Sequence, residues 1–181
     1  MFGLGRAHAH ISRFDAAVDT AMDRLRGHPV ADRVFYAASE LGDFSLLWLI
    51  LAAARGLRSQ RDERVAVRVG INSVAESVLV NGVIKSFFRR SRPSWDVVRP
   101  HKLRQPLTSS FPSGHASAAV SNAILLAEDD PLAPLYYALA VVVASSRVYV
   151  KIHHASDVLA GVGVGVALGL VARRVMPLPN R

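Results

Sequence analysis

The stretch 155–175 decides the fold, and it reads ASDVLAGVGVGVALGLVARRV. A helix needs about 20 predominantly apolar residues to cross a bilayer, and this stretch has that length. Gly161, Gly165 and Gly169 recur every four residues, so one helix face would carry only hydrogen atoms and let a neighbouring backbone approach closely. A dinucleotide-binding turn is the other reading of such a glycine string, but no predicted strand leads into it. We therefore predict a membrane-spanning helix.

Four earlier apolar segments extend this prediction to about five spans. They cover residues 34–54, 65–84, 112–127 and 132–150. The segment 34–54 carries Glu40 and Asp43 in its first half. The segment 65–84 is interrupted by four polar side chains, Arg68, Asn72, Glu76 and Asn81. Pro112 suits the first turn of the helix that we expect to follow it.

Polar connections separate these segments. A charged turn is predicted at 55–64, a long basic loop at 85–111, and an acidic break at 128–131, which reads EDDP. A short connection near residues 151–154 precedes the last span. No long-period repeat and no linker interrupts the pattern, so we predict one domain over residues 1–181.

The N-terminal region predicts a different kind of helix. From Ile11 to Leu25 the apolar residues recur every three or four positions, with acidic and basic side chains on the other faces. The first residues lack the apolar core of a signal peptide, and residue 2 is not the glycine that myristoylation requires. The predicted fold is therefore an all-α, integral-membrane helical bundle of about five transmembrane helices plus an N-terminal amphipathic helix.

Composition narrows the chemistry. The 181 residues include no cysteine, which excludes thiolate metal sites and cysteine nucleophiles. The 22 Lys and Arg against 14 Asp and Glu give a formal net charge of +8, which suggests an anionic partner. The basic residues are spread through helix connections without a recognition motif or interleaved aromatics, so we expect no nucleic-acid partner. Anionic lipid or a phosphorylated substrate fits better.

Three polar strings stand out against the apolar background. They are Lys85-x6-Arg92-Pro93, then Pro112-Ser113-Gly114-His115, then Ser146-Arg147-x5-His153-x3-Asp157. Together they resemble the signature of the type-2 phosphatidic acid phosphatase superfamily, which includes bacterial undecaprenyl-diphosphate phosphatases and, more distantly, vanadium haloperoxidases. All three strings match in order and internal spacing, and the region from Lys85 to Asp157 covers about two fifths of the chain.

The resemblance implies a membrane lipid phosphatase that works without metal or cofactor through a phosphohistidine intermediate. His153 would be the nucleophile and Asp157 its partner. His115 would be the general acid that protonates the leaving oxygen and later activates water. The remaining signature residues, Lys85, Arg92, Ser113, Gly114 and Arg147, would bind the substrate phosphate.

The residue types support these roles on physical grounds. A transferring phosphoryl group spreads negative charge over its oxygens, and fixed cations stabilise it. Lys85, Arg92 and Arg147 supply cations, and the arginines can each bind two phosphate oxygens. A helix beginning near Pro112 would offer free N–H groups to an anion. His153 and Asp157 are four residues apart and would share one helix face, so the carboxylate could accept a hydrogen bond from the imidazole.

Several other polar residues are left out of the predicted site. Arg89, Arg90, Arg99, Lys102 and Arg104 fit a solvated or lipid-headgroup-facing surface. His154 falls at a free position of the motif, so it is interpreted as a local surface residue.

The second span raises a further question. Asn81 shares a predicted face with Ser77 and Lys85 and is a possible headgroup contact. Glu76 and Asn72 fit either a structural hydrogen-bonded pair or headgroup recognition.

Three functions compete at this stage. Hydrolysis of a phosphomonoester or diphosphate on a polyprenyl or glycerolipid substrate leads. A vanadate-dependent peroxidase would use the same anion site, but its known members are larger and soluble. A non-catalytic membrane-binding bundle is the third. The arginine-, alanine- and valine-rich composition is typical of bacteria with GC-rich genomes. Compact members of the resembled family in such bacteria include a phosphatase acting on decaprenylphosphoryl phosphoribose, so the resemblance implies a decaprenylphosphoryl phosphoribose phosphate lipid as the specific substrate hypothesis.

The predicted spans place the three strings on one membrane face. With this topology, 14 Lys and Arg lie on that side and 8 on the other. The positive-inside tendency then predicts a bacterial cytoplasmic-membrane protein whose active site faces the cytoplasm.

Overall fold

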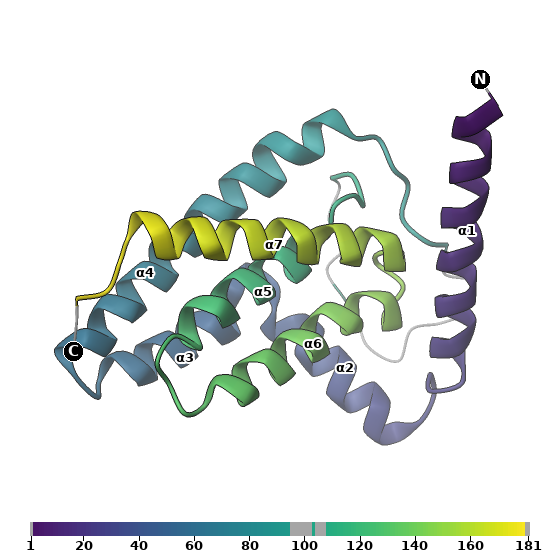
Figure 1. The fold of residues 1–181 in the computed structure, drawn as a ribbon. Coiled ribbons are helices and arrows are strands. Elements are labelled where there is room, and N and C mark those ends of the chain that lie inside the picture. Colours follow the sequence, from purple (N-terminus) through teal and green to yellow (C-terminus); the bar gives the residue numbers. More distant parts are fainter. Residues whose placement is uncertain (1, 95–102, 104–107, 180–181) are drawn as a thin grey trace.

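The computed structural model describes residues 2–94, 103 and 108–179, and within them the chain forms seven α-helices and no strand (Figure 1). The predicted all-α class is confirmed. The helices are α1 (Phe2–Asp23), α2 (Pro29–Leu41), α3 (Leu46–Gly56), α4 (Gln60–Glu76), α5 (Gly114–Leu126), α6 (Ala133–Tyr149) and α7 (Ala155–Val175). Helix α1 is longer than the predicted 11–25 and lies across the end of the bundle where α7 begins (Figure 1).

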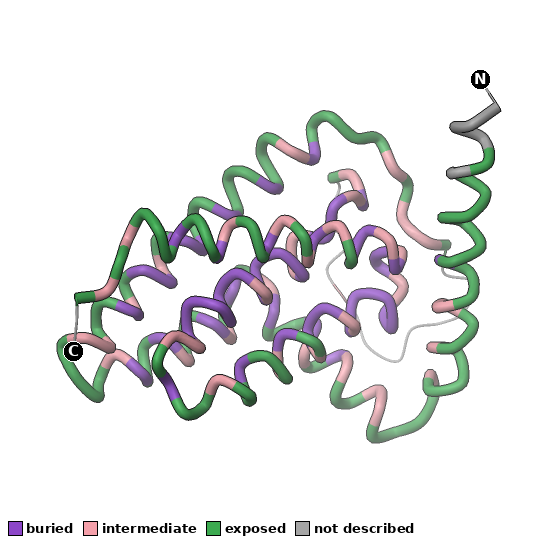
Figure 2. Tube along the Cα trace, in the orientation of Figure 1, coloured by how far each residue is buried: buried purple, intermediate pink, exposed green. Residues whose placement is uncertain are grey.

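Helix α5 forms the centre of the bundle. Ten of its 13 residues are buried, and it contacts α4, α6 and α7 (Figure 2). It begins at Gly114 with Ser113 as its N-cap, so the prediction that Pro112 lies in the first turn is wrong. The Ser113 hydroxyl accepts from the main-chain N–H of Ala116, which gives the helix a defined start at Gly114, two residues after Pro112.

The predicted glycine face of α7 packs directly on α5. A Cβ added to Gly161 would lie 2.4 Å from the carbonyl oxygen of Ser113, and one added to Gly165 would lie 2.5 Å from that of Ser117. At Gly169 the nearest atom would be a side-chain carbon of Ile124, at 3.0 Å. The close approach predicted from the four-residue spacing is therefore present, and it is tightest near the start of α7.

The predicted span 34–54 is broken. Helices α2 and α3 meet at a 72° bend, with a short 3₁₀ turn, Asp43–Ser45, between them. Phe44 and Ser45 have positive φ values of 53° and 60°, which non-glycine residues rarely adopt. The apolar run alone predicted one straight helix, but Asp43 and Gly42 interrupt it and turn the chain towards the site described below.

Helix α4 continues beyond the predicted end of its span. A π-helical segment, Ser77–Val83, and a 3₁₀ turn, Ile84–Phe87, extend it, so that one rod covers Gln60–Phe87. The predicted charged turn 55–64 is much shorter than expected, because Arg55 belongs to α3 and residues from Gln60 onward belong to α4.

Fewer helices have the length of a full crossing than the sequence predicted. Among the described residues, Gln60–Phe87 and Ala155–Val175 are long and apolar enough, and the bent pair α2 and α3 makes a third if it counts as one span. Helix α5 has 13 residues and falls short of a full crossing, whereas α6, with 17, is at the lower limit of the roughly 17–25 residues that a span needs. Helix α5 is apolar for another reason, because other helices enclose it and bury most of its residues.

Outward-facing apolar side chains on the long helices fit a lipid environment. They include Ile71 and Val74 of α4 and Leu170 and Val171 of α7.

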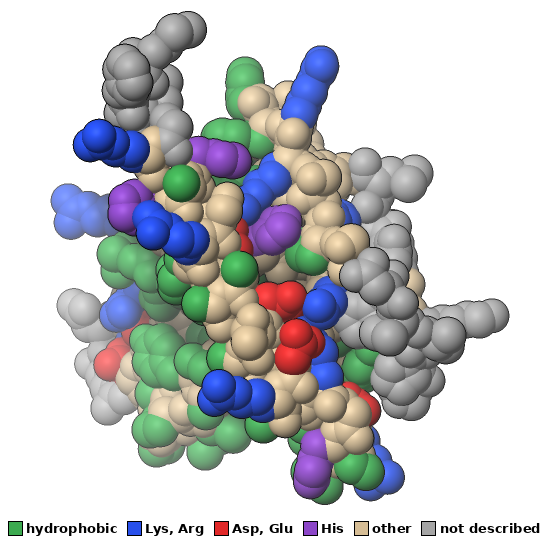
Figure 3. All heavy atoms as spheres, turned by 90° about the vertical axis from the view of Figure 1, so that its right-hand side faces the viewer, with side chains coloured by type: hydrophobic (Ala, Val, Ile, Leu, Met, Phe, Trp, Pro, Cys, Tyr) green, Lys and Arg blue, Asp and Glu red, His purple; other side chains and the backbone are tan. Residues whose placement is uncertain are grey.

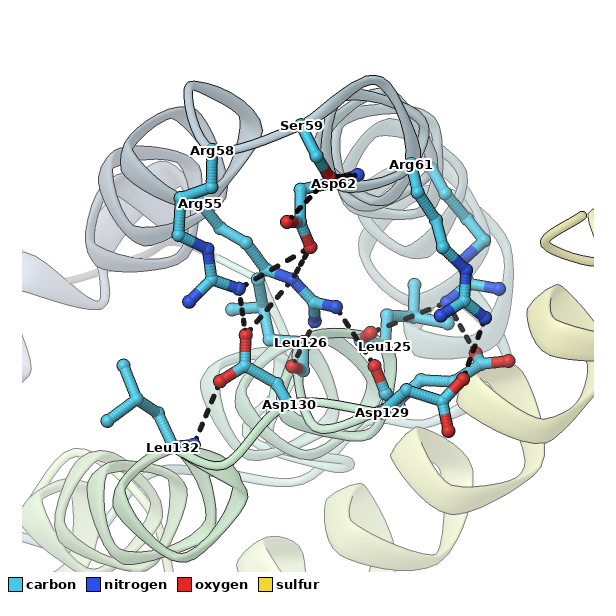
Figure 4. Close-up of polar contacts among 12 residues, drawn as sticks. Arg55, Arg58, Ser59, Arg61, Asp62, Leu125, Leu126, Asp129, Asp130 and Leu132 are labelled. Atoms are coloured by element: carbon cyan, nitrogen blue, oxygen red, sulfur yellow. Dashed lines mark hydrogen bonds and ion pairs between the residues drawn. The ribbon is translucent and has the colours of Figure 1, made fainter. Parts of the chain in front are cut away.

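At the end of the bundle far from α1, charged side chains join two helix connections (Figure 4). We call this group the charged clasp. It comprises Arg55, Arg58, Arg61, Asp62, Arg68, Glu128, Asp129 and Asp130. Arg55 donates to Asp62 at 2.7 Å and to the main-chain carbonyl of Glu128 at 2.9 Å, and Arg58 pairs with Asp130. Arg61 pairs with Asp129, and Arg68 pairs with Glu128 at 2.5 Å. The clasp fixes the α3–α4 turn on the predicted break after α5.

Candidate active site

A cavity of about 300 Å³ lies near the end of the bundle that carries α1. Six of the nine predicted site residues line it, namely Asn81, Lys85, Gly114, His115, Arg147 and His153. They come from the α4 extension, the start of α5, the end of α6 and the α6–α7 connection. Figure 3 looks onto this end of the molecule, where charged and histidine side chains gather over the middle and hydrophobic ones lie to one side. The three sequence strings therefore converge.

His153 is buried between a cation and a carboxylate. Its Nε2 lies 3.3 Å from Nη1 of Arg92, and its Nδ1 lies 3.6 Å from Oδ2 of Asp157. The second distance is longer than a hydrogen bond, although the two groups face each other as the four-residue spacing predicted. Burial, with the nearby Arg147, Arg92 and Lys85 cations, lowers the pKa of His153 to about 3, against the opposing effect of Asp157. The imidazole is therefore neutral near pH 7, as a nucleophile must be.

The three predicted phosphate-binding cations surround this imidazole in different ways. Lys85 is buried, lines the cavity, and makes no ion pair with any carboxylate in the described part of the chain. Arg147 also lines the cavity and donates to the hydroxyl of Ser39 in α2. Arg92 lies beside His153, where its guanidinium also donates to the carbonyls of Ile152 and Thr108. Buried positive charge beside a neutral nucleophile is an arrangement suited to an anionic substrate.

His115 meets a carboxylate that the sequence did not assign to the site. Its Nε2 lies 2.9 Å from Oδ1 of Asp43, in the 3₁₀ turn of the broken span. The neighbouring Gly42 allows this contact, since a Cβ there would lie 2.7 Å from Cδ2 of His115. The bend between α2 and α3 therefore brings both residues against the imidazole.

The start of α5 presents its backbone to the cavity. Gly114 lines the cavity together with His115, and the free N–H groups of a helix start favour anions. Ser113 does not line it, because its side chain caps α5 and is fully buried. Its main-chain N–H donates to the carbonyl of Asp157 at 3.0 Å, so it ties α5 to α7.

The polar residues of α4 divide into two groups. Asn72 donates to Ser121 at 3.0 Å and to Asn122 at 2.8 Å inside the bundle, so its role is structural. Glu76 accepts from the hydroxyl of Ser117 and lines the cavity, as Asn81 does. Glu76 and Asn72 therefore do not form the hydrogen-bonded pair that was one of the two predictions, because each bonds to side chains of α5 instead.

Arg90 corrects the interpretation of the basic loop. Its guanidinium contacts Asp157 and Asp15, each at 2.6 Å, so it is not a solvated surface residue. Arg89 is exposed, as expected, and Arg99, Lys102 and Arg104 lie outside the described residues. The main-chain N–H of His154 donates to Asp157 at 2.9 Å, so this half-buried residue takes part through its backbone.

Two acidic residues at the site were missed by motif reasoning. Asp43 carried a usable signal, because an acidic residue within an apolar run is costly and marks a functional position. Asp15 carried none, since it falls on the polar side of an ordinary amphipathic pattern.

Sequence similarity relates this chain to a known family. Residues 67–181 match the sequence model of the PAP2 superfamily. The chain is 32% identical over 138 residues to decaprenylphosphoryl-5-phosphoribose phosphatase of Mycobacterium tuberculosis. The matched region covers 76% of each protein. It is 33% identical over 148 residues to the protein of the same name from Mycolicibacterium smegmatis, covering 81% of this chain and 80% of the relative.

Two solved structures share the fold. The PAP2 type phosphatidylglycerolphosphate phosphatase of Bacillus subtilis has a TM-score of 0.61 at 23% identity, covering 97% of this chain and 96% of the other. Aquifex aeolicus LpxE has a TM-score of 0.65 at 23% identity, covering 88% and 94%.

Proposed function

The chain belongs to the PAP2 superfamily, and from this premise we propose that it removes a phosphate from a polyprenyl-linked phosphosugar through a phosphohistidine at His153. It is a membrane lipid phosphatase. The observation that carries the proposed mechanism is the neutral, buried imidazole of His153 between Arg92 and Asp157, at the wall of a cavity with Lys85 and Arg147.

The first step forms a bond between Nε2 of His153 and phosphorus, while the bond from phosphorus to the leaving oxygen breaks. Nε2 is the nitrogen beside Arg92, so the attacked phosphate would sit against that guanidinium. His115 gives a proton to the leaving oxygen, and Asp43 holds the imidazole of His115 through Nε2. The cations offset the charge on the phosphoryl oxygens, and Asp157 stabilises the positive imidazole that results.

The second step returns the enzyme to its starting state. A water molecule in the cavity attacks phosphorus and gives a proton to His115, and the bond between phosphorus and Nε2 breaks. Inorganic phosphate leaves, and His153 is neutral again. His115 thus acts as an acid in the first step and as a base in the second.

The proposed substrate class has two supports. The curated relatives named above are phosphatases of decaprenylphosphoryl-5-phosphoribose. In addition, the α4 side of the cavity carries hydrogen-bonding groups, Glu76, Ser77 and Asn81, which can bind the hydroxyl groups of a sugar. A diacylglycerol leaving group has no such hydroxyl groups beside its phosphate.

Phosphate release from purified protein in detergent tests this proposal. The panel is decaprenylphosphoryl-5-phosphoribose, phosphatidic acid, phosphatidylglycerol phosphate and a polyprenyl diphosphate, each with and without chelator. We expect the phosphosugar lipid to give the highest kcat/KM, with chelator having no effect. His153→Ala should be inactive, and His154→Ala is the matched control that should keep most activity. Full activity of His153→Ala would exclude the phosphohistidine. Preference for phosphatidic acid would exclude the sugar assignment.

Asn81→Ala tests the sugar contact separately. It should lower kcat/KM for the phosphosugar lipid more than for phosphatidic acid. Equal losses on both lipids would remove Asn81 from headgroup recognition.

We also propose that the protein lies in the bacterial cytoplasmic membrane with the cavity on the cytoplasmic face, as the excess of basic residues on that side suggests. The native chain has no cysteine, so single cysteines report topology cleanly. Ser94→Cys lies near the cavity and Leu57→Cys lies on the clasp side, and both positions are exposed. In intact spheroplasts an impermeant maleimide should label Leu57→Cys only. Labelling of Ser94→Cys alone would reverse the orientation.

A further inference from the structure

Arg90 connects the N-terminal helix to the carboxylate behind the proposed nucleophile. Its Nη1 lies 2.6 Å from Oδ1 of Asp157, and its Nη2 lies 2.6 Å from Oδ2 of Asp15 in α1. Both carboxylates are buried, with Asp157 0% exposed. One guanidinium therefore bridges two buried anions that are far apart in the sequence.

Asp15 also contacts the first turn of α7. Its Oδ1 accepts from the main-chain N–H of Ser156 at 2.8 Å, and its Oδ2 accepts from the Ser156 hydroxyl at 2.8 Å. The same hydroxyl receives a bond from Nη1 of Arg90 at 2.8 Å. The start of α7, which carries Asp157, is thus held from α1 by a closed set of polar contacts.

From these contacts we propose that Arg90 and Asp15 are positioning residues for the reaction, so that α1 is a part of the active site as well as an amphipathic surface helix. This inference rests on the proposed function, because it assumes that His153 is the nucleophile and Asp157 its partner. Neither Arg90 nor Asp15 lines the 300 Å³ cavity, so both would act through Asp157.

The geometry explains how Arg90 would act. Oδ1 of Asp157 is held by Arg90, and Oδ2 accepts from the N–H of His154 at 2.9 Å while facing Nδ1 of His153. Donors on both oxygens fix the rotation of the carboxylate. Arg90 also forms an ion pair with this fully buried carboxylate, at 2.6 Å, and without it the carboxyl group would bind a proton more readily. A protonated Asp157 could not stabilise a positive imidazole.

The charged groups around Arg90 supply a control. A second cavity, of about 390 Å³, is lined by Asp15, Asp19, Arg90, Lys151, His153 and His154. Asp19 also lies on α1, but it pairs with Lys151 at 3.0 Å and with Arg26 at 2.7 Å, and it makes no hydrogen bond or ion pair with Asp157 or Arg90. Substitution of Asp19 therefore weakens the docking of α1 without breaking the connection from Asp15 to Asp157.

The test compares Arg90→Ala, Arg90→Lys and Asp15→Asn with Arg89→Ala and Asp19→Asn, using the most active lipid of the panel between pH 5 and 8. We expect Arg90→Ala to lower kcat by about 10- to 100-fold, as loss of an outer-shell partner commonly does, with KM nearly unchanged. The defect should grow as the pH falls. Arg90→Lys should restore part of kcat. Asp15→Asn should show a smaller loss of kcat than Arg90→Ala and no such pH trend, because it removes a negative charge near Asp157. Both controls should keep the wild-type pH profile.

Each outcome decides the inference. A pH-independent loss in Arg90→Ala equal to that in Arg89→Ala would overturn it, as would a wild-type kcat in Asp15→Asn. If Arg90→Ala does not fold, Arg90→Lys and Asp15→Asn decide in the same way. His153→Ala separates the two levels: full activity of that variant defeats the proposed function, whereas an inactive His153→Ala beside a wild-type-like Arg90→Ala defeats only the role of Arg90.

Discussion

The charged clasp, on the one hand, and Lys85 and Arg92 at the cavity, on the other, use basic side chains in opposite ways. In the charged clasp, the arginines of α3, of α4 and of the turn between them pair with the carboxylates of Asp62, Glu128, Asp129 and Asp130. At the cavity, Lys85 pairs with no carboxylate among the described residues, and the contacts of Arg92 go to carbonyl oxygens and to an imidazole. The partner of a basic side chain, and not only its place in a polar region, determines whether it can bind a substrate. Charges that are neutralised within the protein hold helices together, and charges that lack a carboxylate can bind a phosphate.

The largest expected effect is on catalysis at the cavity end. Lys85→Met should lower kcat/KM by about 100- to 1,000-fold, because it removes a cation that would stabilise transition-state charge. Its thermal stability in detergent should stay equal or rise, since the variant no longer buries this charge. A kinetic and calorimetric comparison checks both. A large loss of stability would mean that Lys85 is structural, as the clasp arginines are.

The opposite result is expected at the clasp. Asp130→Ala should destabilise the protein by about 3–5 kcal/mol, because Arg55, which is nearly fully buried, and Arg58 lose a buried partner. Activity per folded molecule should remain close to wild type. Thermal unfolding followed together with phosphate release measures the two quantities. A specific loss of kcat without a loss of stability would contradict the division between the two ends.

Substitution of single glycines in α7 tests how closely this helix packs on α5 at different points along its length. Gly161→Ala should destabilise by up to about 3 kcal/mol, because its Cβ would meet the backbone carbonyl of Ser113. Gly169→Ala should cost less, since a side-chain carbon of Ile124 can move aside. Gly163→Ala, with no atom within 4 Å of its Cβ, is the control and should not destabilise. Equal unfolding temperatures for Gly161→Ala and Gly163→Ala would show that the seam tolerates bulk.

The smallest effect concerns pH. Because the pKa of His153 is lowered to about 3 in the folded state, the unfolded chain binds the extra proton first as the pH falls below about 6.5. Stability is therefore present at neutral pH and lost on acidification, by about 2 kcal/mol between pH 7 and 5. His153→Gln should remove that part of the pH dependence of thermal unfolding. No clasp substitution should remove the part that belongs to His153. An unchanged slope in His153→Gln would show that its imidazole is not kept neutral.

Much of the site could be predicted because its residues carry the signature spacing. Lys85, His115, Arg147 and His153 do line one cavity, and α7 has its predicted bounds. Asp43 and Arg90 could not be assigned in the same way. Asp43 reaches His115 only through the bend between α2 and α3, and hydropathy does not encode a bend. Arg90 occupies a free motif position, so its role follows only from contacts across the fold.

The pairing of side chains within the charged clasp also could not be predicted from the sequence. The acidic break at 128–131 and the basic turn near 55–64 were both predicted, but as separate connections. Their pairing depends on how α3, α4 and α5 pack, which is a property of tertiary structure rather than of local sequence. Likewise, the apolar composition of α5 predicted a span, whereas other helices surround it.

The π-helical segment Ser77–Val83 makes the active site sensitive to the phase of a helix as well as to its side chains. In this wider winding, Ser77, Asn81 and Lys85 all face the cavity. An α-helix advances about 100° per residue, and the wider π-helical turn advances less, so the same residues rewound as a regular α-helix would turn Lys85 away from the cavity. Such a chain would keep every signature residue and still point its lysine elsewhere. The winding of this helix between the motifs is therefore a functional character of the protein, as much as the side chains that the helix carries.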